Sequence, residues 1–105
     1  RFDLLGMFAP ESVRAIAAAL RRERPDVLLY GEPWTGGGPV RFGTGAQRGT
    51  GVGIFNDRFR GVVRGDLDGD APGFAAGGGA DPAALRRAFS GSPEIADTPA
   101  ESVNY

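Results

Sequence analysis

The sequence predicts an α/β fold built on a parallel sheet. Two short apolar segments, residues 1–6 and 27–30, flank an amphipathic helical pattern, and this spacing is typical of one β-α-β unit. Strand and helix patterns continue to alternate along the remaining chain, and no internal repeat or linker divides the 105 residues. Alternation of this kind favours parallel strands, because parallel neighbours need a crossover connection.

The first helix is expected to begin at Pro10, because proline fits the first helical turn. Its apolar residues recur at i, i+3, i+4 and i+7, at Val13, Ile16, Ala17 and Leu20. Pro25 ends the helix before the next strand. That strand, residues 27–30, is a continuous apolar run between Pro25 and Gly31, so we expect it to be buried on both faces.

The Gly-rich segment 35–52 predicts a loop. A loop of this length inside a compact domain is usually either functional or disordered. Its glycines match no phosphate-binding pattern, since no Gly-x-Gly-x-x-Gly opens a helix and no Gly-Lys-Ser/Thr occurs. Nucleotide binding is therefore not indicated.

Strand and helix patterns return after this loop. Residues 53–56 are expected to form a third strand, and residues 57–65 a short helix. The acidic stretch 66–70 has the spacing of the start of a Ca²⁺ loop. The apolar Leu67 and the lack of a closing Glu favour a solvated turn instead.

A last helix is expected after Asp81 and Pro82, which suit the N-cap and the first helical turn. Leu85 and Phe89 give this helix one apolar face. Residues 102–105 then have the character of a final strand.

Composition excludes several classes of function. The formal charge is −1 and every basic residue is Arg, which gives no electrostatic case for binding nucleic acid. The chain has no Cys and no His, so it offers neither disulfides nor thiolate or imidazole metal ligands. We expect no cofactor and no metal, and no apolar run is long enough to suggest a membrane span.

The two predicted strands that flank the first helix each deliver a carboxylate, Asp3 and Glu32. Neighbouring parallel strands lie about 4.8 Å apart, and a retaining glycosidase holds its two carboxyl groups roughly 5 to 5.5 Å apart. The arrangement therefore suits a glycosidase that acts by double displacement. Arg1 shares a strand face with Asp3, and its guanidinium favours the ionised form of that carboxylate.

Four separated segments carry a family resemblance. RFDLLG resembles the nucleophile strand of the α-amylase superfamily, and YGEPW resembles its acid/base strand. FNDRFRGVVRG and the closing SPEIADTPAESVNY resemble type I pullulanases in particular. The resemblance runs from the first residue to the last, with a variable Gly-rich middle.

The resemblance implies a partial TIM (β/α)₈ barrel. A whole barrel needs about 250 residues, so residues 1–105 would be roughly half of one catalytic domain, truncated at both ends. It further implies a third catalytic carboxylate beyond Tyr105, and hence that the isolated fragment is inactive. Its partners would be a branched α-glucan substrate and the remainder of its own barrel.

The resemblance also implies individual roles. Asp3 resembles the nucleophile, with Arg1 orienting it, and Glu32 resembles the general acid/base. Because the acid must carry a proton, we expect the site to raise the pKa of Glu32, and the flanking Tyr30, Pro33 and Trp34 are apolar. From the residues alone, Arg1 and Asp3 could instead pair at a hairpin edge or surface turn, and Glu32 could be a loop or capping residue.

Three further residues are predicted to bind substrate. Trp34 can lie against the apolar face of a glucose ring, although plain packing under the Gly-rich loop is an equal alternative. Asn56 and Asp57 follow the third strand, where barrel active sites are built. Asp57 could equally cap the following helix, which we favour. Asn104 and Tyr105 are weaker candidates on the final strand.

The function implied is a hydrolase that cleaves α-1,6 branch linkages in pullulan, starch or glycogen-derived dextrins. One alternative is isoamylase or a glycogen-debranching enzyme, which the Glu-Pro-Trp form of the acid/base motif favours. Another is a non-catalytic carbohydrate-binding relative, which would need one of the carboxylates replaced. The compartment, cytoplasmic or secreted, stays open.

Overall fold

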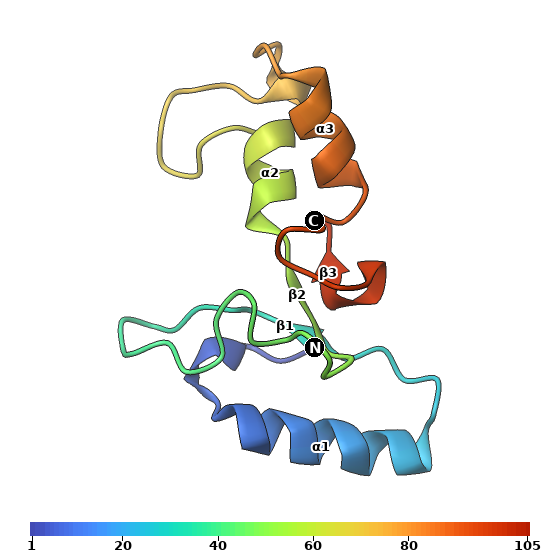
Figure 1. The fold of residues 1–105 in the computed structure, drawn as a ribbon. Coiled ribbons are helices and arrows are strands. Elements are labelled where there is room, and N and C mark those ends of the chain that lie inside the picture. The colour runs from blue at the N-terminus through green and yellow to red at the C-terminus, as the bar shows by residue number, and fades with distance from the viewer.

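The computed structural model describes residues 1–105 and contains three α-helices and three short strands (Figure 1). The helices are α1 (Pro10–Glu23), α2 (Asp57–Val63) and α3 (Pro82–Phe89), and the strands are β1 (Tyr30–Gly31), β2 (Gly53–Phe55) and β3 (Ser102–Val103). Three 3₁₀ turns complete the list: η1 (Leu5–Met7), η2 (Phe74–Ala76) and η3 (Pro99–Glu101). In Figure 1 α1 lies on one side of the sheet, and α2 and α3 lie together on the other.

The sheet is parallel, with strand order β1-β2-β3, as the alternating pattern predicted. Tyr30 pairs with Gly53, and Ile54 pairs with Ser102. Phe2 adds an isolated parallel bridge to Gly31 on the free side of β1. The carboxyl ends of these segments therefore face one edge of the sheet, although the three strands do not show a closed or half-closed barrel.

The first predicted strand is wrong beyond Phe2. Leu4 takes a left-handed conformation, with φ 46° and ψ 42°, and the chain turns into η1. Gly6 then donates its N–H to the Glu32 carbonyl at 2.9 Å. A Cβ at Gly6 would collide with the backbone of Trp34, so only glycine allows this close return. The turn fixes Asp3 at the sheet edge.

Helix α1 forms where the periodicity predicted it and buries Val13 and Ala17, whereas the predicted apolar residue Leu20 is 41% exposed. The core cluster of buried side chains consists of Leu5, Val13, Ala17, Leu29, Phe42, Val52 and Ile54. The prediction for residues 27–30 is partly wrong, because pairing begins only at Tyr30 and Leu28 is 82% exposed. An apolar run alone does not say which of its side chains meets the core.

The Gly-rich segment 35–52 is a loop, as predicted, and it is tied down at several points. The Gly6 carbonyl accepts from the N–H groups of Arg41, at 2.7 Å, and Phe42, at 3.1 Å, and the Phe42 side chain is fully buried. Farther along, Gln47 Nε2 donates to the Ile95 carbonyl at 2.5 Å. These contacts join segments far apart in sequence, so this part of the loop is held against the rest of the fold.

Helices α2 and α3 pack against each other, with the rings of Phe59 and Phe89 edge to face at 5.1 Å. Asp81 caps α3, as predicted, since its carboxylate accepts from the N–H of Ala83 at 3.0 Å. The acidic stretch 66–70 is non-helical, and no group of three or more potential metal-ligating side chains occurs. No helix has both the length and the apolar character needed to cross a bilayer.

Candidate active site

The fold brings Asp3 and Glu32 together at the edge of the sheet. Each residue directly follows a member of the Phe2–Gly31 bridge, so the two carboxylates leave neighbouring parallel segments at the same level. One guanidinium nitrogen, Arg1 Nη2, lies 3.4 Å from Asp3 Oδ1 and also hydrogen bonds to Glu32 Oε1. Because a single nitrogen contacts both carboxylates, the two groups are close neighbours.

The two carboxylates differ in access to solvent. The Asp3 side chain is 77% exposed, whereas that of Glu32 is only 11% exposed. Glu32 is held from a second side by the N–H of Leu4, which donates to Oε2 at 2.9 Å. The left-handed turn at Leu4 thus fixes the buried carboxylate and leaves the neighbouring one open to an incoming molecule.

The pKa of Glu32 is lowered, contrary to the expectation that the site would raise it. The hydrogen bond from the Leu4 backbone is the largest cause, burial acts in the opposite direction, and the hydrogen bond from Arg1 lowers the pKa further. The burial provided by the neighbouring side chains is thus outweighed by the contacts with Leu4 and Arg1. In this chain Glu32 is therefore held as a carboxylate.

An aromatic cluster lies beside the carboxylates. The Trp34 ring is stacked on Phe55, with centroids 5.9 Å apart and planes inclined by 23°, and Tyr105 contacts the same ring at 4.6 Å. The guanidinium of Arg1 lies 5.8 Å from the centre of the Phe55 ring. Phe55 therefore contacts both Arg1 and the other aromatic side chains, a role that no sequence motif indicated.

Trp34 and Asp57, two of the predicted substrate-binding residues, line one cavity of about 390 Å³. The remaining lining residues are Thr35, Arg60 and Leu67. The cavity combines an aromatic face with a carboxylate and a guanidinium, which suits a ligand that presents both apolar faces and hydroxyl groups.

Asn56 does not fit the predicted role in substrate binding. Its side chain is fully buried, and its Oδ1 accepts from the N–H of Phe59 at 3.1 Å, so it caps α2. The favoured interpretation of Asp57 as that cap is consequently wrong by one residue. Both side chains can cap a helix, and the helix begins at Asp57 because the preceding asparagine is the one turned inward.

Asp57 instead contacts the end of the chain. Its Oδ1 accepts from the Tyr105 hydroxyl at 2.5 Å and pairs with Arg60 at 3.3 Å. Arg60 also donates to the Tyr105 oxygen at 2.6 Å. Burial and then the neighbouring Asp57 raise the pKa of Tyr105 to about 12. The i,i+3 spacing of Asp57 and Arg60 could have indicated their pairing, but nothing in the sequence indicated that Arg60 also contacts Tyr105, 45 residues away.

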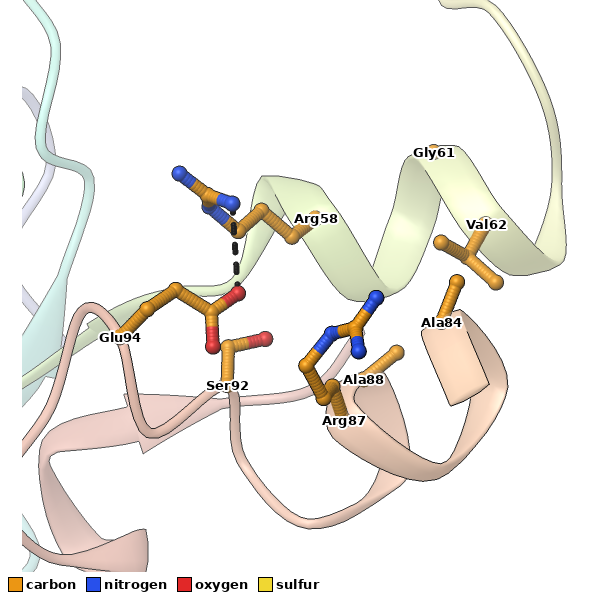
Figure 2. A pocket seen from close by; sticks show the side chains of 8 residues that line it. All are labelled: Arg58, Gly61, Val62, Ala84, Arg87, Ala88, Ser92 and Glu94. Carbon is orange, nitrogen blue, oxygen red and sulfur yellow. Dashed lines mark hydrogen bonds and ion pairs between the residues drawn. The ribbon is translucent and has the colours of Figure 1, made fainter. Parts of the chain in front are cut away.

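A second cavity, of about 280 Å³, lies between α2 and α3 (Figure 2). Its wall includes Gly61 and Ala84, and an ion pair of 3.2 Å between Arg58 and Glu94 borders it. The cavity contains neither Asp3 nor Glu32. It therefore belongs to the packing of the two helices rather than to the carboxylate pair.

Sequence and structure relate the chain to pullulanases along its whole length. The pullulanase of Bacillus subtilis is 33% identical over an alignment of 117 residues that covers 100% of this chain. The solved pullulanase of Bacillus acidopullulyticus matches 100% of the chain with a TM-score of 0.92 and 32% identity. A pullulanase from an Anoxybacillus species, solved in complex with maltotriose, matches 100% with a TM-score of 0.85 and 32% identity.

The chain corresponds to only a small part of these proteins. It spans 16% of the B. subtilis pullulanase, and 14% and 16% of the two solved chains. No protein-family model matches the sequence. The chain is thus homologous to one region of the pullulanases, and that region includes the Asp3 and Glu32 segments.

Proposed function

We propose that this chain is part of the catalytic domain of a retaining glycoside hydrolase that cleaves α-1,6 branch linkages in pullulan, starch or glycogen-derived dextrins. The observation that carries the proposal is the shared contact of Asp3 and Glu32 with one nitrogen of Arg1. Homology to pullulanases over the whole chain supports the choice of linkage. The rest of a (β/α)₈ barrel would complete the domain, and the chain alone would be inactive.

The proposed reaction has two displacements. Asp3, the more exposed carboxylate, attacks the anomeric carbon while Glu32 transfers a proton to the departing glycosidic oxygen. Glu32, now ionised, removes a proton from water, which attacks the glycosyl-enzyme and releases the sugar with retained configuration. Arg1 orients Asp3 through its contact with Oδ1.

The lowered pKa of Glu32 supports the second step and opposes the first. Leu4 and Arg1 stabilise the carboxylate that activates water, whereas protonation of the leaving group requires the acid form. The resemblance implies a third carboxylate beyond Tyr105. A negative charge close to Glu32 would raise its pKa by like-charge repulsion, and would complete the site.

The aromatic cluster and its cavity support an α-glucan substrate. Pullulanase structures similar to this chain contain maltotriose and maltose, and Trp34 offers a partly exposed ring beside a cavity of about 390 Å³. The comparisons with pullulanases do not favour the isoamylase alternative. Asp3 and Glu32 are both present, so nothing in this chain favours a non-catalytic binding protein.

The test is the stereochemistry of hydrolysis by the longer protein that we propose contains this chain. Close carboxyl groups leave no space for water on the face opposite the leaving group, so the α-anomer should be released first. Early-time NMR on a branched glucan measures which anomeric signal appears before mutarotation. First appearance of the β-anomer would contradict the mechanism, and no release of reducing ends from pullulan would contradict the substrate.

A further inference from the structure

Ser92 follows α3 in a buried turn and has an unusual backbone conformation. Its φ is +52°, directly after Gly91 at +88°, and the residue is only 1% exposed. A left-handed conformation is strained for a residue with a Cβ, and glycine would adopt it without that cost. A serine at this position therefore needs an interaction that glycine cannot make.

The hydroxyl of Ser92 makes that interaction with Asn56. Asn56 Nδ2 donates to Ser92 Oγ at 2.9 Å, and the hydroxyl donates back to Asn56 Oδ1 at 3.2 Å. The same Nδ2 donates to Asn104 Oδ1 at 2.9 Å. With the helix-capping bond from Phe59, both lone pairs and both protons of the Asn56 amide are used.

This cluster, made of Asn56, Ser92 and Asn104, joins three segments. Asn56 follows β2, Asn104 follows β3, and Ser92 follows α3. The Phe59 N–H can only donate, so the Asn56 oxygen must face it and the amide nitrogen must face Asn104. The amide can satisfy all of its partners in one orientation only, and it adds a side-chain link between the two strand ends to the backbone bond from the Asn56 N–H to the Val103 carbonyl.

The next residue after each asparagine lies at the proposed glucan site, since Asp57 lines the cavity beside Trp34 and Tyr105 belongs to the aromatic cluster. Asp57 follows Asn56 and Tyr105 follows Asn104, and the Tyr105 hydroxyl donates to Asp57 Oδ1 at 2.5 Å. The buried amide contact and the outer tyrosine contact thus lie one residue apart on the same two strand ends. We expect a change in the inner contact to be passed on to the outer one.

We infer that Ser92 is a positioning residue, which sets the location of Tyr105 and Asp57 beside Trp34 for binding a glucan. The inference rests on the proposed function, because the surface it positions is the proposed substrate surface. Ser92 touches no carboxylate of the reaction, and it acts through Asn56.

The surroundings of Ser92 allow the hydroxyl to be removed without collapse. Ser92 lies on the wall of the cavity between α2 and α3, near Glu94 and Arg58 (Figure 2). The space left by the hydroxyl adjoins this cavity, so water can fill it. We therefore expect Ser92→Ala to fold, with the strand ends held less tightly.

The experiment compares Ser92→Ala and Ser92→Gly in the longer protein, with Ser90→Ala as the control. Ser90 lies in the same turn, is exposed, and its hydroxyl contacts only the Arg87 carbonyl. We expect both Ser92 variants to raise KM for a branched glucan and Kd for maltotriose about tenfold, with kcat changed less than about twofold. The control should leave both constants unchanged.

The glycine variant separates positioning from stability. It removes the hydroxyl and also relieves the backbone strain, so its Tm should exceed that of Ser92→Ala while its KM stays equally raised. If KM instead recovered with Tm, the residue would be merely structural and the inference would be overturned.

A crystal structure of Ser92→Ala decides the inference independently of activity. We expect the Tyr105 hydroxyl to leave hydrogen-bond distance of Asp57, and an unchanged contact would overturn positioning by Ser92. Failure of the unsubstituted protein to hydrolyse pullulan or bind maltotriose would instead contradict the proposed function, with the crystal structure still deciding the role of Ser92.

Discussion

Two clusters of polar side chains lie at the same edge of the sheet, and they are built in opposite ways. Asp3, Glu32 and Arg1 form a charged cluster in which Asp3 is largely exposed. Asn56, Ser92 and Asn104 form a neutral cluster centred on a fully buried amide. The first cluster leaves carboxylate oxygens accessible, whereas the second uses every bonding position of the central amide.

The contrast separates groups that can react from groups that hold the fold. A carboxylate with open lone pairs can accept a proton or attack a carbon, so the charged cluster has capacity for chemistry. A saturated buried amide cannot meet a ligand without losing an internal hydrogen bond. Polarity at the carboxyl edge of a parallel sheet is therefore insufficient to identify a substrate-binding residue.

The largest effect is expected from Asp3→Asn in the longer protein. An amide cannot replace the attacking carboxylate, so kcat on a branched glucan should fall about 10⁴-fold or more. Initial-rate measurements of reducing-end release check this, with Asp26→Asn as a matched control on the surface, where Asp26 pairs only with Arg24. Near-native turnover by Asp3→Asn would remove the charged cluster from the chemistry.

Glu32→Gln should have a smaller effect that depends on the leaving group. Loss of the proton donor should slow cleavage of natural branched glucans about 10²- to 10⁴-fold. Substrates with good leaving groups need little acid assistance, so the glycosyl-enzyme should still form on Asp3 and be detectable by mass spectrometry. Equal loss on both kinds of substrate would argue against Glu32 as the acid.

Charge placed in the neutral cluster should destabilise the fold rather than alter chemistry. Asn56→Asp keeps an acceptor for the cap of α2, but it removes both donors and buries a carboxylate. We expect a loss of about 3 kcal/mol in the free energy of unfolding. Urea titration measures it, and Asn56→Ser, which keeps a capping oxygen without the charge, should lose distinctly less. Equal losses would show that burial of charge is unimportant here.

Tyr105 should give the smallest effect, and one that depends on pH. Its pKa is raised from 10.0 to about 12, so the folded state favours the neutral phenol. The stabilisation from the hydroxyl is then fully present below pH 10.0 and is lost as the pH rises through about 12. Tyr105→Phe should cost about 1 kcal/mol at neutral pH, and the difference from the unsubstituted protein should shrink over that range in urea titrations. A difference in the free energy of unfolding that stays constant over this pH range would contradict the prediction.

Local signals in the sequence predicted much of the fold. The Pro10 start of α1 and the helix itself are confirmed, as are the Asp81 cap of α3 and the parallel sheet. These features depend on residues within one or two helical turns of each other. The exposed Leu28 shows what local patterns cannot predict, because the burial of a side chain depends on which distant segment covers it.

The site was less predictable because its geometry is set by long-range backbone contacts. The residue types of Asp3 and Glu32 suggested that the carboxylates would meet, but the lowered pKa of Glu32 comes from an N–H of Leu4, 28 residues away. The exchange of roles between Asn56 and Asp57 has a similar origin. Adjacent residues of equal capping ability are distinguished only by the partners that surround them, Ser92 and Tyr105.

The tethering of the Gly-rich loop has a consequence for how the protein can be altered. Backbone contacts at Arg41 and Phe42 hold one end of the segment 34–42, and the packing of Trp34 on Phe55 holds the other end. Between them, Gly37 and Gly38 have open surroundings in which an added Cβ would meet no atom within 4 Å. Extra residues inserted there would disturb the local turn in which the Thr35 hydroxyl donates to the Gly38 carbonyl, and we expect both tethers to stay in place. A carbohydrate-binding module grafted at this span would be carried beside Trp34 at the edge of the proposed glucan site.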